Sequence, residues 1–149
     1  MTTPTYDQNN VFAKVLRGDL PSHKVFENEH VLAIMDIMPR GDGHVLVLPK
    51  VAARNILDIA PDALDGLFRG VQTVARAAKA AFKADGITIQ QFSEPAGGQV
   101  VFHLHVHVIP RFDGVKLRPH TGEMAPNATL AEQAAAIRAV IGYTSGPDN

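Results

Sequence analysis

The chain has 149 residues, the length of one domain with a core large enough to fold without disulfides or structural metal. Its 14 lysines and arginines almost balance its 15 aspartates and glutamates, and a formal charge of -1 excludes an extended basic surface for nucleic acid. The absence of cysteine excludes thiol catalysis and cysteine-ligated zinc, and the lack of an export signal or a membrane-length apolar run leads us to expect a cytoplasmic protein without membrane contact.

The first third of the chain predicts one short helix and three strands. Residues 9–18 have apolar side chains on one helical face, asparagines that can cap the start, and Gly18 at the end. The runs 23–28, 30–37 and 43–49 are rich in Val, Ile and Leu and are separated by short turn segments, which is typical of strands. Because parallel strands need long crossovers, these three are expected to form an antiparallel meander.

Residues 61–85 predict a long amphipathic helix. Pro61 suits its first turn, and Gly86 suits its C-terminal cap. Apolar side chains recur along it every three or four residues and are expected to form one buried stripe. The stripe consists of Leu64, Leu67, Phe68, Val71, Val74, Ala78 and Phe82.

The rest of the chain predicts two more strands, a loop and a last helix. The strands are residues 87–93 and 100–110, and the loop is residues 112–128. Thr129 and Glu132 have the spacing of a capping box at the start of the helix. With no repeat and no linker, the whole chain is expected to form one α+β domain on a five-stranded antiparallel sheet, with the long helix and short flanking helices.

The last predicted strand carries three histidines at alternate positions. Since side chains alternate across a strand, His103, His105 and His107 are expected on one face, with the residues between them in the core. A lone histidine in a strand is often structural. Each of three neighbouring imidazoles needs hydrogen-bond partners of its own, and the three rings would repel one another if they were protonated. The triplet therefore indicates a functional site.

Two kinds of chemistry fit three neighbouring imidazoles. Neutral imidazole is a ligand for zinc, copper and iron, but such a site usually also has a supporting carboxylate, and none lies on this strand. Alternatively, one neutral imidazole attacks phosphorus and forms a covalent phosphoramidate, which water then hydrolyses, while its neighbours bind the phosphate oxygens. The residues alone leave both possibilities open.

The run HLHVHVI resembles the signature of the histidine triad (HIT) family, in which three histidines alternate with apolar residues. Residues 11–50 are similar to the first half of bacterial HIT proteins, and residues 93–111 are similar to their catalytic loop and strand. The resemblance covers residues 11–111. It leaves residues 112–149 as the C-terminal loop and helix of a single HIT domain spanning residues 1–149.

The resemblance implies a HIT-like fold whose sheet continues into that of a second copy, giving a homodimer. It also implies cleavage at the α-phosphate of a purine nucleotide conjugate, a phosphoramidate or a dinucleoside polyphosphate, through a nucleotidyl-histidine intermediate and with no obligatory cofactor or metal. By this resemblance His105 is the nucleophile, His107 binds the phosphate, and His103 orients the nucleophile. His44 matches a fourth histidine that supports the triad from a neighbouring strand.

Further positions match nucleotide contacts of the family. Asp36 matches the acid that binds the ribose hydroxyls. In the loop before the triad, backbone N–H groups of Gly97, Gly98 and Gln99 and the Gln99 amide are expected to approach phosphate oxygens. Apolar positions match the pocket around the base; these are Val11, Phe12, Val15, Leu20, Ile34 and Ile37.

Two positions in the same loop depart from the family pattern. Ser93 stands where many members have asparagine, and Val100 stands where many have a hydroxyl near the leaving group. These departures suggest an altered leaving-group preference. The missing hydroxyl at Val100 also motivates a second hypothesis, a nucleotide-binding regulatory module with little turnover, and a metalloenzyme remains a third. Of the remaining histidines, His23 and His30 are expected on the surface, and His120 lies in a loop that closes over the substrate in relatives.

Overall fold

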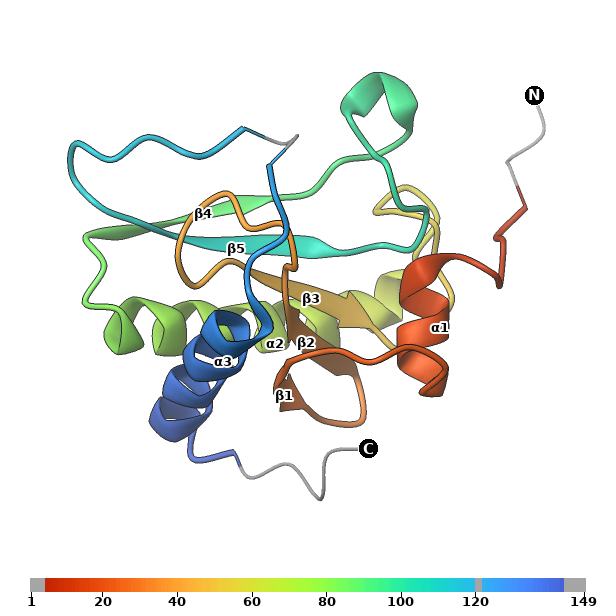
Figure 1. Ribbon diagram of the computed structural model, residues 1–149. Helices are drawn as coiled ribbons and strands as arrows, with labels where there is room; N and C mark the ends of the chain where they lie inside the picture. The colour runs from red at the N-terminus through yellow and green to blue at the C-terminus, as the bar shows by residue number, and fades with distance from the viewer. Residues whose placement is uncertain (1–4, 120–121, 144–149) are drawn as a thin grey trace.

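The computed structural model describes residues 5–119 and 122–143 of the chain. Within these residues the centre is one five-stranded sheet in which every neighbouring pair of strands is antiparallel (Figure 1). The α+β class, the antiparallel sheet and the meander of the first three strands are thus confirmed. The strands, in their order across the sheet, are β1 (Lys24–Glu27), β2 (Val31–Met35), β3 (Val45–Pro49), β5 (Val106–Arg111) and β4 (Gly86–Gln90).

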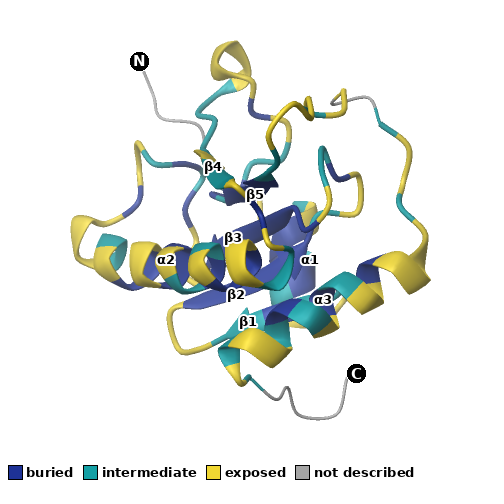
Figure 2. Cartoon of the chain, turned by 90° about the vertical axis from the view of Figure 1, so that its left-hand side faces the viewer, coloured by how far each residue is buried: buried dark blue, intermediate teal, exposed yellow. Residues whose placement is uncertain are grey.

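Three helices of the described chain cover the two faces of the sheet. Helix α1 (Val11–Arg17) packs on one face, and α2 (Leu64–Ala81) and α3 (Asn127–Ile141) pack on the other (Figures 1 and 2). Short 3-10 turns at Pro61–Ala63 and Pro95–Gly97 precede α2 and β5. Among the described residues, no helix has both the length and the apolar character needed to cross a membrane.

The central strands lie between two hydrophobic layers. Odd-numbered residues of β2 and β3 pack against α2 and α3, and even-numbered residues pack against α1. Because both faces are covered, every residue of these two strands is buried, which explains their uninterrupted apolar sequences. Figure 2 shows the buried strands between the helices. The layer on the α1 side, called the α1 layer below, contains Phe12, Val15, Leu32, Ile34, Leu46 and Leu48.

β5 begins at Val106, so the expected strand over residues 100–110 is wrong in its first half. The chain before it bends, and the Leu104 N–H donates to the Ala53 carbonyl at 2.8 Å instead of to a neighbouring strand. Only His107 of the three histidines lies in the strand. The residues between and after the histidines are buried as expected; they are Leu104, Val106 and Val108.

Two helix ends also differ from expectation. Lys83 has a left-handed φ of 52°, which a right-handed helix cannot continue, so α2 ends earlier and Gly86 begins β4 instead of capping the helix. α3 begins directly after Pro126, whose fixed φ suits the position before a first turn. Thr129 and Glu132 therefore lie inside the helix, and the expected capping box does not form.

Gly43 sets the turn that leads from β2 into β3. Its φ is +80°, and a Cβ at this position would lie 2.5 Å from the ring of Phe82, so both the conformation and the close approach require glycine. Its N–H donates to Gln133 Oε1 of α3 at 3.1 Å. The turn is thereby fixed to the helical layer, and with it the next residue, His44.

Candidate active site

Three polar side chains from neighbouring strands meet on the sheet face covered by α1. Asp36 follows β2 and His44 precedes β3, both at even positions that point to this face. His107 lies in β5 opposite Leu46, in the same layer. His44 Nε2 is 2.9 Å from His107 Nδ1 and 3.4 Å from Asp36 Oδ2. Strand alternation and register therefore bring these three groups together.

The backbone fixes the protons of His44 and His107. The Arg40 N–H donates to His44 Nδ1 at 3.0 Å, so this nitrogen carries no proton and the proton of the neutral ring lies on Nε2. His44 Nε2–H then donates to His107 Nδ1. Because Nδ1 accepts this hydrogen bond, the neutral His107 ring carries its proton on Nε2.

The backbone also fixes the protons of His103 and His105. His103 Nε2–H donates to the Pro49 carbonyl at 2.9 Å, and its Nδ1 accepts the hydroxyl of Tyr6 at 2.5 Å. His105 Nδ1–H donates to the carbonyl of His103 at 2.6 Å. In the neutral ring, His105 Nε2 therefore carries a lone pair and no proton. Burial lowers the pKa values of both imidazoles, which favours their neutral forms near pH 7.

The expected row of three imidazoles on one strand is not found. The rings of His105 and His107 are adjacent, with centroids 5.0 Å apart, and Phe12 of α1 meets the His105 ring edge-on at 4.8 Å. The His103 ring instead points to Pro49 and Tyr6. It contributes to the site through its backbone carbonyl, since the chain at this position is not in the sheet.

Asp36 is a carboxylate in a largely buried position. Its side chain is 17% exposed, and burial raises the pKa of the carboxyl to about 6, despite the hydrogen bond from the Met38 N–H to Oδ1. It lies beside the His44 ring, which is fully buried. A carboxyl group whose pKa is raised by burial in this way is typical of functional sites.

Asp36, His44 and His107 also form a group that could hold a metal ion by distance alone, with ligand atoms within 4.8 Å of one another. The proton positions do not fit a metal. His44 Nδ1 already accepts the Arg40 N–H, so a cation on Nε2 would require an imidazolate with no proton at all. The expected alternative of three histidine ligands does not fit either, because both nitrogens of His103 have protein partners.

The positions matched to a base pocket divide into two groups. Phe12, Val15 and Ile34 lie in the buried α1 layer, and Phe12 contacts the His105 ring. The other three lie at the surface, between 39% and 51% exposed, and are therefore open to a ligand without forming part of the core; they are Val11, Leu20 and Ile37.

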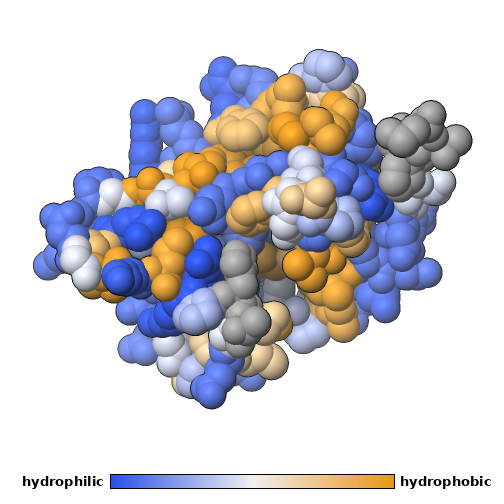
Figure 3. Space-filling model, turned by 90° about the horizontal axis from the view of Figure 1, so that it is seen from above, coloured by the Kyte–Doolittle hydropathy of each residue, from blue (hydrophilic) through white to orange (hydrophobic). Residues whose placement is uncertain are grey.

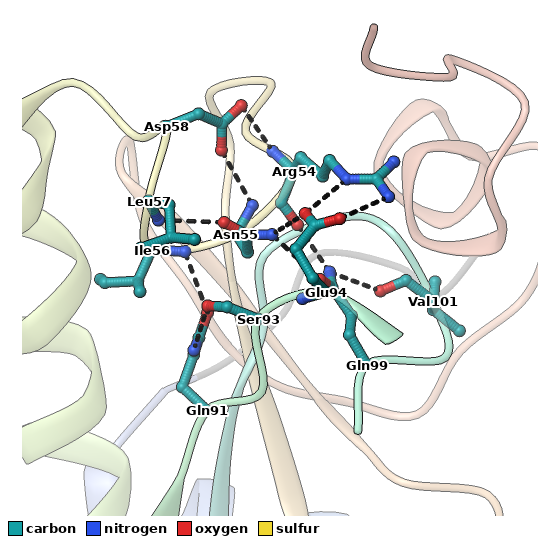
Figure 4. Close-up of polar contacts among 10 residues, drawn as sticks. All are labelled: Arg54, Asn55, Ile56, Leu57, Asp58, Gln91, Ser93, Glu94, Gln99 and Val101. Carbon is teal, nitrogen blue, oxygen red and sulfur yellow. Dashed lines mark hydrogen bonds and ion pairs between the residues drawn. The ribbon is translucent and has the colours of Figure 1, made fainter. Parts of the chain in front are cut away.

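The loop before the triad differs from the expectation in its hydrogen bonds. The backbone N–H groups of Gly97, Gly98 and Gln99 donate to carbonyls within the loop, and both groups of the Gln99 amide bond to protein atoms (Figure 4). In this conformation none of them is a phosphate donor. Ser93 Oγ bonds to the Gln91 side chain, and Val100 is 83% exposed.

Several residues of the site gave no signal in the sequence. Tyr6 contacts His103 from a segment far away in the chain. Arg40 contributes its backbone N–H, which donates to His44 Nδ1. Arg54 binds the Glu94 carboxylate from the loop after β3. The Tyr6 and Arg54 contacts join segments whose proximity depends on the fold, and the Arg40 contact depends on the backbone conformation of one turn, so no residue pattern marks them.

The remaining histidines lie away from the triad contacts. His30 is exposed, and it packs against α2, where its ring lies beside Gly66. His23 is partly exposed and lies 3.4 Å from the side chain of Asn127. His120 lies outside the described residues.

Comparison with known proteins places this site in a family. A family model described as the HIT domain matches residues 17–114. The protein hit of Bacillus subtilis is 39% identical over 105 residues, which are 70% of this chain and 72% of that protein. The adenylylsulfatase HINT3 of Arabidopsis thaliana is 32% identical over 107 residues, which are 72% of this chain and 54% of that protein.

Solved structures agree with the sequence matches. A Hit-like protein involved in cell-cycle regulation from Bartonella henselae is 47% identical with a TM-score of 0.86, over 91% of this chain and 99% of its own. A zinc-bound histidine triad family protein from Mycobacterium smegmatis is 34% identical with a TM-score of 0.81, over 91% of this chain and 94% of its own. With this fold and these matches, the chain belongs to the histidine triad (HIT) family.

Proposed function

We propose that this protein hydrolyses or transfers the nucleotidyl group of a purine nucleotide conjugate, such as a phosphoramidate or a dinucleoside polyphosphate, through a covalent nucleotidyl-His105 intermediate. The observation that carries the proposal is the hydrogen bond from His105 Nδ1 to the His103 carbonyl, which leaves Nε2 with a lone pair. A neutral imidazole nitrogen of this kind is a nucleophile toward phosphorus. The depressed pKa of His105 keeps that lone pair available near pH 7.

The reaction has two displacement steps. His105 Nε2 attacks the α-phosphorus, a nitrogen–phosphorus bond forms, and the bond to the leaving group breaks. The electron pair of that bond goes to the leaving group, which takes a proton from the solvent. Water then attacks the phosphorus and breaks the nitrogen–phosphorus bond, which releases the nucleoside monophosphate, returns one proton to the solvent and restores the neutral ring. An acceptor other than water gives transfer instead of hydrolysis.

The neighbouring groups supply binding and electrostatic stabilisation. His107 Nε2–H donates to a phosphate oxygen, and its orientation is held by His44. Asp36 accepts hydrogen bonds from the ribose hydroxyls. The base lies over the α1 layer at Phe12, next to the exposed Val11. The adenylylsulfatase activity named for the Arabidopsis relative supports a substrate with a nucleotide α-phosphate.

Trapping the intermediate tests this proposal. We expect the wild-type protein, mixed with adenosine and guanosine phosphoramidates and dinucleoside polyphosphates, to gain the mass of one nucleotidyl group on the peptide containing His105. The His105→Asn variant should bind nucleotide and lose turnover by a factor of about 10⁴ or more, because it removes the nucleophile. Full turnover by this variant would show that another group attacks phosphorus.

A second candidate function is a nucleotide-binding regulatory module with little turnover. Val100 favours it, because the side chain is 83% exposed and offers no hydroxyl to a leaving group. The same substrates distinguish the two. Rapid multiple turnover rules out the module, whereas tight nucleotide binding with no released product supports it.

We propose further that the reaction needs no metal and that the protein works in the cytoplasm. The proton arrangement at His44 supports the first point, and the zinc of the Mycobacterium smegmatis neighbour belongs to that protein. Turnover should therefore survive exhaustive chelation followed by metal analysis. A loss of activity that added zinc restores would contradict this.

A further inference from the structure

Two histidines of the site lie in a segment that is not part of the sheet. His103 and His105 precede β5, where the backbone bends and makes no strand pairing. Catalysis by an imidazole depends on its placement to a fraction of an ångström. Some other set of contacts must therefore fix the segment that delivers these two residues.

The loop after β3 and the loop before the triad are joined by side chains (Figure 4). Arg54 donates to both oxygens of the Glu94 carboxylate, from Nε at 2.7 Å and from the terminal nitrogen at 3.0 Å. Asn55 Nδ2 donates to the same carboxylate at 2.6 Å. The Arg54 guanidinium also stacks on the ring of Phe102, with 4.1 Å to its centroid, one residue before His103.

Gln99 connects this ion pair to the backbone. Its Oε1 accepts from Asn55 Nδ2 at 3.1 Å and from the Glu94 N–H at 2.8 Å. Its Nε2 donates to the carbonyl of Arg54 at 2.7 Å and to that of Val101 at 3.0 Å. Gln99 is 5% exposed, and its amide oxygen and both of its amide N–H groups are hydrogen-bonded, so this side chain connects the two loops.

Glu94 has an unfavourable backbone conformation for a residue with a side chain. Its φ of 67° and ψ of 161° lie in a region that is populated almost only by glycine. The conformation persists because the carboxylate and the N–H are both tied down. Arg54, hydrogen-bonded to the carboxylate, lowers the pKa of Glu94, so it stays ionised over the neutral range.

We propose that Arg54, Asn55, Glu94 and Gln99 form a latch that positions the His103 carbonyl and, through it, the ring of His105. Gln99 donates to the Val101 carbonyl, and Arg54 stacks on the Phe102 ring. The latch therefore contacts both residues that directly precede His103. Since Leu104 N–H bonds to Ala53, the residue before Arg54, the latch and the triad segment share one anchor. These are positioning residues, and the inference rests on the proposed role of His105.

Hydrogen exchange tests the latch without any activity. Arg54→Met removes both hydrogen bonds and the stacking, so the amides of Gly97 to Gln99 and of Leu104 should exchange about tenfold faster or more, with the sheet unchanged. Arg69→Met is the matched control, because Arg69 pairs with Asp65 through Nε at 2.8 Å on the exposed side of α2. It should leave these amides unchanged.

Kinetics test the consequence for catalysis. Arg54→Met should slow nucleotidyl transfer in single turnover about tenfold or more while the dissociation constant for the nucleoside monophosphate changes less than about threefold. Glu94→Gln keeps one of the two accepting oxygens and should show a smaller loss. Because the two residues act as one unit, the double variant should be no slower than Arg54→Met alone.

Three results would overturn the latch. One is unchanged exchange of the four amides in Arg54→Met. Another is a loss of nucleotide affinity as large as the loss of rate, which would make Arg54 a substrate contact. The third is additive losses in the double variant. If the wild-type protein has no nucleotidyl transfer at all, the proposed function fails, and the exchange experiment still decides whether the latch exists.

Discussion

At the scale of single residues, backbone groups decide which nitrogen carries the proton in His44, His103 and His105, and the His44 ring decides it for His107. The Arg40 N–H makes an acceptor of His44 Nδ1, whereas carbonyls of the chain make donors of the His103 and His105 rings. When one nitrogen of a neutral ring is fixed in this way, the protonation state of the other nitrogen follows. The different roles of the four histidines therefore follow from the hydrogen-bonding groups that surround each ring.

Asp36 gives a prediction about stability and pH. Its pKa rises on folding from 3.8 to about 6, so between these values the folded state binds more protons and this group's contribution to stability falls as the pH rises. Above about pH 6 the buried charge costs about 3 kcal/mol, from about two pKa units. Asp36→Asn should therefore be more stable than the wild type at pH 7 by up to this amount, and similar near pH 4.

Urea unfolding at several pH values measures this difference. Asp65→Asn is the control, because the Asp65 side chain is 76% exposed and its replacement should change stability little. The same Asp36→Asn variant should bind nucleotide more weakly if the carboxylate binds the ribose. A variant less stable than the wild type at pH 7 would show that the hydrogen bonds of Asp36 outweigh its desolvation.

Tyr6 gives a second prediction at this scale. Tyr6→Phe keeps the ring contact with His103 and removes the hydroxyl, which leaves a buried Nδ1 without its donor. An unpaired buried acceptor costs about 1–3 kcal/mol, and urea unfolding should show this loss. Tyr143→Phe, at a tyrosine that packs edge-on against Phe26, should cost less than about 0.5 kcal/mol. Equal stability of the two variants would contradict the role of the hydroxyl.

At the scale of the secondary structure elements, one short helix closes the site. α1 has seven residues, too few to be stable alone, and it is held by its cap and by the α1 layer. Phe12 in this helix contacts the His105 ring. The stability of α1 is therefore connected to the environment of the proposed nucleophile.

The cap of α1 can be tested directly. Asn10→Ala removes the hydrogen bond from the Ala13 N–H at 2.9 Å and should destabilise the protein by about 1 kcal/mol. Asn9→Ala is the control, since the sequence allowed either asparagine as the cap and only the side chain of Asn10 accepts this N–H. Thermal unfolding should separate the two variants. Equal shifts would mean that the cap contributes nothing.

At the scale of the whole molecule, the sheet ends in a strand that could pair further. β4 is an outer strand, and its Ile89 is 43% exposed. Phe68 of α2 was expected in the buried stripe but is also 43% exposed. The side on which β4 lies carries hydrophobic patches among hydrophilic side chains (Figure 3). An open strand edge beside apolar surface favours association of two copies.

We therefore expect a homodimer joined through β4 into one continuous sheet. Light scattering after size exclusion should give twice the chain mass for the wild type, and Ile89→Arg should shift the protein toward the monomer, because it places a charge in the interface. Val140→Arg, at a 50% exposed position of α3, should stay a dimer. A wild-type monomer at micromolar concentration would contradict this arrangement.

Much of the fold was predictable, for reasons visible in particular elements. The meander of β1 to β3 followed from short turns, and α1 from its asparagine and Gly18. The strand at residues 100–110 was wrong in its first half, because an alternating pattern reports which residues are buried and not whether a partner strand is present. Leu104 is buried as a strand residue would be, but its N–H bonds to a loop.

The sequence by itself determined the family, the sheet and which residue types occupy the site, because apolar periodicity and the spacing of the histidines are local properties of the chain. The tertiary structure alone decided which nitrogen of each ring is protonated and which side chains hold the triad segment. Tyr6 and Arg54 act through contacts between distant segments, and the Arg40 N–H meets His44 because of the conformation of the turn between β2 and β3. Such contacts depend on where the fold places each backbone group, and no local pattern of residues records that.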